Sequence, residues 1–494
     1  MPINYIPNDP RAGATAPAMR VQSPRANRPS TRSGFTFSNV SVQGVFAPGT
    51  PGFLFWQCRE AAIAALQAWE ASAGAHSKWQ GNRSKLPLRQ DAGVVLNAFY
   101  DRQSFSFFHK ALGGDTFFSG ASTDVVAHEV GHGLLDSVRP DFFSVNFLEV
   151  GALHEAFGDC MALLTALADN ASRISLLAAA PNLRKKNFVE STAEDLSEGI
   201  RRFNPIHNAA EPRHAFNKFQ YQLPSSLPSN GGPGKLINEV HSFGMLFSGC
   251  FWDVIANIFA AGASQTEAAL ASAAALAGRI LIAGVKAAVI TPRFLQSVGR
   301  AMVLADQSLN GGANRDHIRN AFQAHNILLG GANALIAPSM ILAGMAPKGK
   351  TLSPATHKDL KARFSAGKGA KMTFAATDLF GTKTVEVLNT REVSLSSVAK
   401  ELKGVVCMAH EPVIVGGSGG RAAVMGGMPN TEDTDNEVIE FVKSLMEHDR
   451  IDLGKKKSAI AADGDTSAAT HAVKSVGGRK VLSRVCFHCG VPHC

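Results

Sequence analysis

The stretch His128-Glu129-Val130-Gly131-His132 decides which fold and which chemistry this sequence predicts. Residues four apart on an α-helix lie on one face, so His128 and His132 can bind the same metal ion. Glu129 lies one position further round, where its carboxylate can hold a water molecule without binding the metal. Two imidazole ligands beside a basic carboxylate are the parts of a hydrolytic metal centre. The alternative is a surface helix with two unrelated histidines.

The residues around the motif favour metal binding. Ser122-Thr123-Asp124 are good N-cap residues for a helix that begins just before the motif. An apolar stripe then runs along this helix and leaves the two histidines and Glu129 outside it. The stripe consists of Val125, Val126, Val130, Leu134 and Leu135.

A second predicted helix, over residues 149–164, carries two more polar groups. Glu155 and Asp159 are four residues apart and share a face. A catalytic zinc ion takes three protein ligands and keeps one open position, so Glu155 can be the third ligand. Asp159 can orient a histidine by accepting its free ring N–H. An ordinary solvated carboxylate pair is the alternative, but the neighbouring residues are too apolar for an exposed helix.

These residues resemble the thermolysin-like, glutamate-zinc peptidases. The resemblance begins with His128-Glu129-x-x-His132 followed by Glu155-Ala-Phe-Gly-Asp159. Upstream, Asn97-Ala98-Phe99-Tyr100 is similar to the edge strand that pairs with the substrate backbone in this family. Downstream, Val240-His241-Ser242-Phe243-Gly244 is similar to the segment that holds the second catalytic histidine.

Further segments resemble the fungalysin branch of this family. Gly199-Ile200-Arg201 is similar to a motif whose arginine is expected near a substrate carbonyl. The other segments are 305–307, 310–314 and 321–322. The resemblance therefore covers residues from about 90 to 330, with the motifs in the family's order.

The resemblance implies a thermolysin-like, two-lobed α+β fold with a strand-containing N-terminal lobe, a helical C-terminal lobe and the zinc site in the cleft between them. It implies that Glu129 takes a proton from a zinc-bound water and that His241 donates to the oxyanion. The other implied site residues are the zinc ligands His128, His132 and Glu155, the orienting carboxylate Asp159, and Asn97, Ala98 and Arg201 along the substrate.

This sequence departs from the thermolysin pattern in two ways. No tyrosine lies between His132 and Glu155, where the family has one that stabilises the oxyanion; Phe142 and Phe143 lie in that stretch. The carboxylates of the family's calcium sites are also hard to find, apart from Asp124. We therefore expect zinc as cofactor and leave calcium open.

Composition limits the other functions that this sequence can have. The net charge of +9 over 494 residues is modest and spread along the chain, whereas a nucleic-acid binder concentrates its charge in a patch. Residues 268–290 are apolar, but Arg279 and Lys286 interrupt them, so we expect a buried helix and no membrane span.

No signal peptide is visible. We expect a cytoplasmic protein, or one exported by a signal-independent route, with a protein or peptide substrate; delivery machinery or an inhibitor is left open as a further partner.

Four regions are expected along the chain. Residues 1–40 are rich in Arg, Pro and Ser and predict a disordered basic arm. Residues 41–335 form the catalytic domain, with helices at 53–72 and beyond 125, strands near 94–108 and an irregular loop over 204–234. Residues 345–453 predict a small α/β module, with helices at 396–402 and 436–447. Residues 454–494 predict a linker and a Cys/His-rich tail.

The seven cysteines do not predict a disulfide framework. Cys58, Cys160, Cys250 and Cys407 stand singly among apolar neighbours, as buried free thiols do. The tail contains the other three thiols and two imidazoles, Cys486, His488, Cys489, His493 and Cys494. They could close a second zinc site. A second alternative is inhibition, because Cys489-Gly490-Val491-Pro492 resembles the cysteine switch of matrix metalloproteinases, in which a thiolate occupies the open position of the catalytic zinc. A third alternative is that the tail is disordered and inert.

The sequence thus predicts a zinc endopeptidase, with latency through the Cys-rich tail as an added hypothesis. One alternative is a zinc-bound binding or structural protein that has lost turnover, which the missing tyrosine suggests and the intact Glu129 opposes. Another is a peptidase effector or toxin delivered to another cell, because a basic arm, a latent tail and no signal peptide would all suit one.

Overall fold

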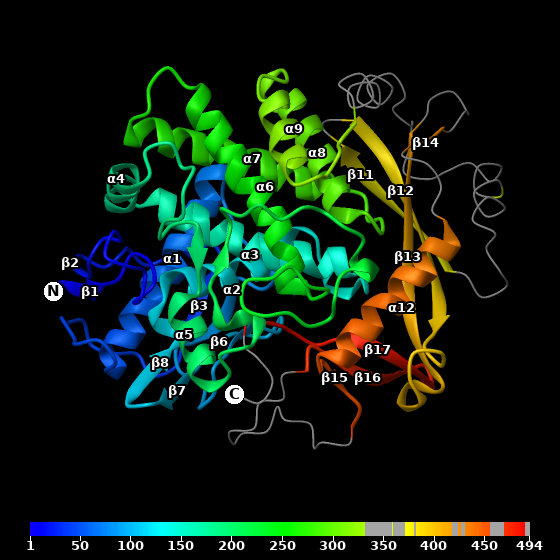
Figure 1. Cartoon of the computed structure of the whole chain (residues 1–494), viewed down its shortest axis with the longest axis horizontal. Coiled ribbons are helices and arrows are strands. Elements are labelled where there is room, and N and C mark those ends of the chain that lie inside the picture. Colours follow the sequence, from blue (N-terminus) through cyan, green and yellow to red (C-terminus); the bar gives the residue numbers. More distant parts are fainter. Residues whose placement is uncertain are drawn as a thin grey trace.

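The chain folds as a mixed α+β protein in which a largely helical body lies beside a C-terminal sheet (Figure 1). The computed structural model describes residues 1–330, 358, 371–379, 382–416, 423–425, 430–454 and 469–489. The α+β class expected from the sequence is confirmed. The glycine-rich residues 416–420 predict a flexible loop, and 417–420 lie outside the described residues.

Residues 1–40 differ from the expected disordered arm. Strands β1 (Ile3–Tyr5) and β2 (Arg20–Gln22) pair with each other, and β3 (Gly34–Phe37) joins the main sheet of the body. The arginines of this segment pair with carboxylates that are distant in sequence, at 3.1 Å for Arg25–Glu60 and 2.7 Å for Arg28–Glu70. These ion pairs neutralise the arginine charges from which disorder was predicted.

A five-stranded sheet of the body has the order β18-β5-β6-β4-β3. Its inner strands are β4 (Lys85–Arg89), β5 (Ala98–Tyr100) and β6 (Phe105–Phe107). Strands β7 (His109–Leu112) and β8 (Asp115–Phe118) form a separate hairpin. The edge strand β18 (Phe487–His488) comes from the C-terminal end of the described chain and runs antiparallel to β5.

The helices of the body pack around α3 (Leu148–Ala168), which is buried along almost its whole length. Its neighbours are α1 (Pro51–Ala73), α2 (Thr123–Val138), α6 (Val240–Ala261), α7 (Glu267–Ala287) and α8 (Phe294–Asn310). The smaller helices are α4 (Asn170–Ala179), α5 (Glu194–Phe203) and α9 (Arg315–Ala324).

Glycines at their contact let α2 and α3 pack closely together. A Cβ at Gly131 would lie 3.0 Å from the Cα of Gly158, and a Cβ at Gly158 would lie 2.6 Å from Nδ1 of His128. Side chains at either position would push the two helices apart. The absence of a Cβ therefore lets residues of α2 and α3 share one site.

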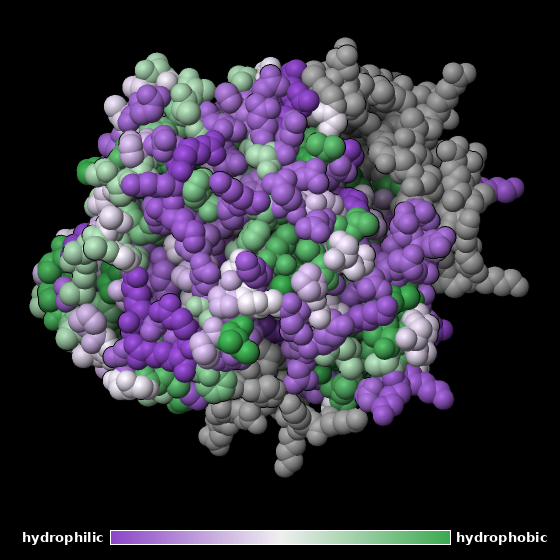
Figure 2. Space-filling model, in the orientation of Figure 1, coloured by the Kyte–Doolittle hydropathy of each residue, from purple (hydrophilic) through white to green (hydrophobic). Residues whose placement is uncertain are grey.

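Three helices are long and apolar enough to cross a bilayer by length and composition. They are α3, α6 and α7, and the most apolar windows of these helices are 100%, 78% and 56% buried within the fold. Their apolar surface is thus used in packing. The face drawn in Figure 2 is largely hydrophilic, with hydrophobic residues in separate small groups.

The C-terminal sheet has the order β11-β12-β13-β17-β16-β15, with β14 (Ala423–Met425) paired to β13. Its strands are β11 (Lys371–Leu379), β12 (Thr382–Ser394), β13 (Val405–Gly416), β15 (Ile451–Asp452), β16 (His471–Val476) and β17 (Arg479–Arg484). Helix α12 (Thr431–Glu447) packs between this sheet and α3. Of the helix expected at 396–402, only a 3₁₀ turn over Lys400–Leu402 forms.

Part of the expected linker is a β-hairpin. Strands β16 and β17 are joined by Gly477 and Gly478, with φ of +58° and +79°. Two-residue hairpin turns need positive φ at both positions, which glycine adopts without strain. The chain that follows β17 is therefore anchored to a sheet before it reaches the body.

Candidate metal centre and cleft

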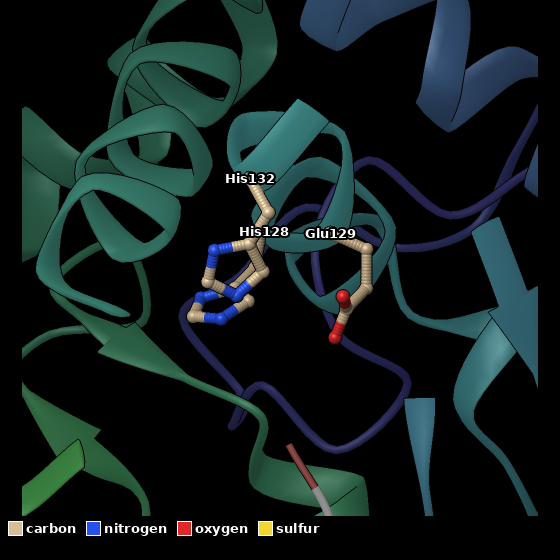
Figure 3. A group of neighbouring side chains, drawn as sticks. All are labelled: His128, Glu129 and His132. Atoms are coloured by element: carbon tan, nitrogen blue, oxygen red, sulfur yellow. The ribbon is translucent and has the colours of Figure 1, made fainter. Parts of the chain in front are cut away.

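The candidate metal centre is built on α2. Ser122 caps this helix by accepting a hydrogen bond from the N–H of Val125. The side chains of His128, Glu129 and His132 are fully buried, and Figure 3 shows the two imidazole rings together with the Glu129 carboxylate to one side. Ligand atoms of these three residues lie within 4.8 Å of one another.

Glu155 of α3 completes a set of three ligand atoms. Its Oε2 lies 3.2 Å from Nε2 of His128 and 3.5 Å from Nε2 of His132. Ligands of a tetrahedral zinc ion with bonds of ~2.0–2.1 Å lie about 3.3 Å apart. Burial lowers the pKa of His132 to about 4, which keeps this ring neutral and its lone pair available. These residues therefore fit zinc in both spacing and chemistry.

A second layer of side chains orients the histidines. Nδ1 of His128 donates to Oδ1 of Asp159 at 2.8 Å, and Nδ1 of His132 lies 2.8 Å from Nδ1 of His154. Nη2 of Arg213 donates to Asp159 at 2.8 Å. Burial opposes ionisation of Asp159, but Arg213 and His128 outweigh it and lower the Asp159 pKa to about 2. Asp159 is thus a carboxylate that fixes the ring of His128.

Glu129 is a buried carboxylate beside the two histidines. Neither of its carboxylate oxygens has a hydrogen-bond partner among the described residues, although both are buried. Burial, followed by the charges of Cys489 and Glu155, raises the Glu129 pKa well above its usual value. A buried carboxylate without a partner is costly to stability and is characteristic of a functional group.

His241 lies at the start of α6 and faces the same site. Glu239 caps this helix by accepting from the backbone N–H groups of His241 and Ser242. The Glu239 carboxylate also holds Nδ1 of His241 at 2.8 Å. This leaves Nε2 of His241 facing Oε2 of Glu155 at 3.2 Å and donating to the carbonyl of His488 at 2.8 Å.

The C-terminal tail pairs with β5, the strand that the sequence resemblance implies would be an edge strand pairing with substrate. Phe487 and His488 pair with Tyr100 and Phe99, and the N–H of Cys489 donates to the carbonyl of Ala98 at 2.9 Å. The side chain of Asn97 accepts from the N–H of Ala98 at 2.8 Å. The tail is therefore held by the main chain of β5.

Cys489 places its thiol beside the metal centre. The residue is only 5% exposed, its thiol is close enough to His128 for each group to shift the pKa of the other, and its Sγ lies 4.0 Å from Nη2 of Arg213. Burial opposes ionisation, but the charges of His128 and Arg213 outweigh it and lower the pKa of the thiol.

The other tail residues point elsewhere. Cys486 faces the carbonyl of Ala469 at 3.6 Å, and the ring of His488 meets Nη1 of Arg450 at 2.9 Å. Within the described ranges these residues form no metal group with Cys489. His493 and Cys494, the other two members of the expected tail site, lie outside the described residues.

Arg201 is not brought to the site. Its side chain is 61% exposed and pairs with Glu198 on the surface of α5. Arg213, which lies in the irregular stretch between α5 and α6, instead binds Asp159 beside the candidate metal centre. Nothing in the sequence indicated Glu239 or Arg450, which also lie at this site. His154 immediately precedes Glu155, and this position beside a candidate ligand is the signal that the sequence offers for it.

A second carboxylate group lies at the beginning of α2. Ligand oxygens of Asp9, Asp124 and Glu194 lie within 4.8 Å of one another. Burial, and then their mutual repulsion, raises the pKa values of Asp9 and Glu194 well above the usual range. This group could hold a cation, and Asp9 comes from the segment that was expected to be disordered.

A cavity of about 730 Å³ opens beside the metal centre. Leu196 and Ile200 of α5 contribute apolar surface, and His241 and Cys489 contribute the polar end. Arg450, just after α12, lines the opposite wall. The cleft is therefore bounded by the helical body on one side and by the C-terminal region on the other.

Residues 114–331 match the family model described as fungalysin metallopeptidase (M36). The matched range contains both helices of the metal centre and His241. A search of curated proteins gives no match.

Proposed function

We propose that this chain, whose residues 114–331 form a domain of the fungalysin metallopeptidase (M36) family of thermolysin-like zinc metallopeptidases, is a zinc-dependent endopeptidase. The observation that carries the proposal is the spacing of the nitrogens of His128 and His132 around Oε2 of Glu155, at 3.2 and 3.5 Å. An unpartnered Glu129 beside this set supplies the base that hydrolysis needs.

In the proposed mechanism His128, His132 and Glu155 hold the zinc ion, which when bound acidifies water and polarises the scissile carbonyl. Strand β5 aligns the peptide through its main chain at Ala98. Glu129 accepts a proton from the attacking water and then delivers it to the leaving amine. Nε2 of His241 donates a hydrogen bond to the developing oxyanion.

Peptide cleavage is the direct test of this function. The full-length Cys489→Ser protein, loaded with zinc, is incubated with a peptide library, and the products are identified by mass spectrometry. We expect internal cleavage that stops when a chelator removes the metal and returns when zinc is restored. A zinc-loaded protein that cleaves no peptide would contradict the proposal and favour the alternative of a zinc-bound structural protein.

We expect His241→Phe to lower kcat by roughly 10²–10³, the usual effect of removing one oxyanion donor. His241→Gln keeps a donor near the same place and should lose much less. Both rates are measured in the Cys489→Ser background with saturating peptide. A loss below about threefold in His241→Phe would show that this ring does not contact the reacting carbonyl.

We further propose that the tail keeps the full-length enzyme latent. Three contacts support this idea: the pairing of Phe487 and His488 with β5, the hydrogen bond from His241 to the His488 carbonyl, and the Cys489 thiol beside His128. Together they cover strand β5, the proposed oxyanion donor and the candidate metal centre. Thiolates are strong zinc ligands, so Cys489 would also fill the position that water needs.

We expect Cys489→Ser to raise the initial rate of peptide cleavage roughly tenfold or more, because a tethered segment competes with substrate at an effective concentration in the millimolar range. Cys486→Ser is the matched control and should change the rate less than twofold, since Cys486 faces Ala469 outside the cleft. Equal rates for the wild-type protein and both variants would show that the tail does not inhibit.

A further inference from the structure

The side chain of Phe487 fills an aromatic pocket next to the metal centre. Its ring stacks on His154 with centroids 3.8 Å apart and on His132 at 4.9 Å. Phe143 meets it edge-on at 5.4 Å, and the guanidinium of Arg484 lies 4.2 Å above it. We call the surface formed by His132, His154 and Phe143 the Phe487 pocket.

The main chain around Phe487 is held as an extended peptide. Phe487 and His488 pair with β5, and the next N–H, that of Cys489, is bound by Ala98. Alternate residues of a strand face opposite sides. Phe487 and Cys489 accordingly face the metal helices, whereas His488 faces Arg450. Any peptide bound to β5 in this register would direct every second side chain to the same places.

The pocket is formed mainly by the body of the protein. His132 belongs to α2, His154 belongs to α3, and Phe143 lies in the short 3₁₀ turn between these helices. His132 and His154 are also held by their mutual hydrogen bond. These walls belong to α2, α3 and the turn between them, so they do not leave with the tail.

We propose that the Phe487 pocket is a substrate subsite that selects an aromatic side chain two residues before the residue whose N–H pairs with Ala98. The proposal rests on the peptidase function proposed above and names the class of peptide that the cleft prefers. Stacking on two imidazoles and edge-on contact with Phe143 favour a flat ring over an aliphatic or charged side chain.

Binding tests the subsite without requiring turnover. The protein is the full-length Phe487→Ala/Cys489→Ser variant, in which the tail no longer fills the pocket. The probes are two labelled pentapeptides, Val-Ser-Xaa-His-Ser, with Phe or Ala at Xaa, and affinity is measured by fluorescence anisotropy. We expect the Phe peptide to bind about tenfold or more tightly, as burial of one aromatic side chain provides. Equal affinities would overturn the proposal.

Two neighbouring phenylalanines provide a matched pair of variants. Phe143→Leu should reduce the Phe/Ala ratio by about threefold or more, because it removes the edge-on ring. Phe142→Leu should leave the ratio unchanged, since Phe142 packs against Phe294 at 4.8 Å. Thermal melting checks that both variants fold. An equal effect of the two substitutions would overturn the assignment of the pocket.

Cleavage profiling distinguishes the subsite from the catalytic function. If the library products are enriched in aromatic residues at one fixed position before the cleaved bond, the proposal stands. Cleavage without that enrichment would make the pocket a docking site for the tail alone and would overturn the proposal. Tight binding of the Phe peptide without any cleavage would contradict the peptidase function and leave the pocket's preference for aromatic side chains standing.

Discussion

Glu129→Gln in the Cys489→Ser background should lower kcat/KM by roughly 10³-fold or more while zinc content and fold are retained. The amide has nearly the shape of the carboxylate but cannot accept a proton from water at neutral pH. Both oxygens of Glu129 are buried and accept no hydrogen bond among the described residues, so the substitution breaks none. Initial rates, zinc analysis and thermal melting give the three readouts.

Glu149→Gln is a suitable control for this experiment. Glu149 is also fully buried on a helix of the body, but its carboxylate binds the hydroxyl of Tyr221 at 2.7 Å, outside the metal centre. The control should alter stability more than kcat. If Glu129→Gln retained wild-type activity, the mechanism would have no base, and the proposed role of Glu129 would be wrong.

The parts of the site that lie on regular helices could be predicted from the sequence. Helical periodicity alone placed His128 and His132 on one face and paired Glu155 with Asp159. Local spacing determines such geometry, because consecutive turns of a helix fix where side chains point. The helices of the body followed from apolar periodicity for the same reason.

Arg213 could not be predicted in this way. It lies in the irregular stretch between α5 and α6, where no periodicity relates sequence position to direction in space. Arg201 lies on the regular helix α5 and was expected at the site, but its side chain is exposed to solvent. The role of an arginine thus depended on the tertiary fold, which its local sequence does not encode.

The structure of the two ends of the chain also depends on contacts between residues that are distant in sequence, which local patterns do not indicate. The N-terminal arginines predicted disorder only because their acidic partners are distant in sequence; Arg28, for example, meets Glu70. At the other end, Gly477-Gly478 was a hairpin signal that the Lys/Gly/Ser-rich composition obscured. That hairpin directs the tail into the cleft, so the tail contacts could not be inferred from the tail alone.

Substitution of the proposed zinc ligands should give a graded loss of metal. His132→Ala and Glu155→Ala each remove one of three protein ligands, and we expect purified Cys489→Ser protein with either change to retain little of its roughly one zinc ion per chain. Asp159→Asn keeps all ligands but loses the carboxylate that accepts the His128 ring N–H at 2.8 Å. Its zinc affinity should fall by about 10–100-fold, the usual effect of such a partner.

Elemental analysis and competition with a chromogenic chelator measure this series, and His325→Gln is its control. His325 is nearly as buried as the ligands but binds the carbonyl of Phe219 at 2.8 Å, away from the centre. The zinc affinity of the His325→Gln variant should equal that of the parent protein. Because Arg213 also binds Asp159, Asp159→Asn should lose stability as well as zinc affinity, so affinities are compared below its melting transition. An unchanged zinc content in both His132→Ala and Glu155→Ala would show that the ion binds elsewhere and that the ligand assignment is wrong.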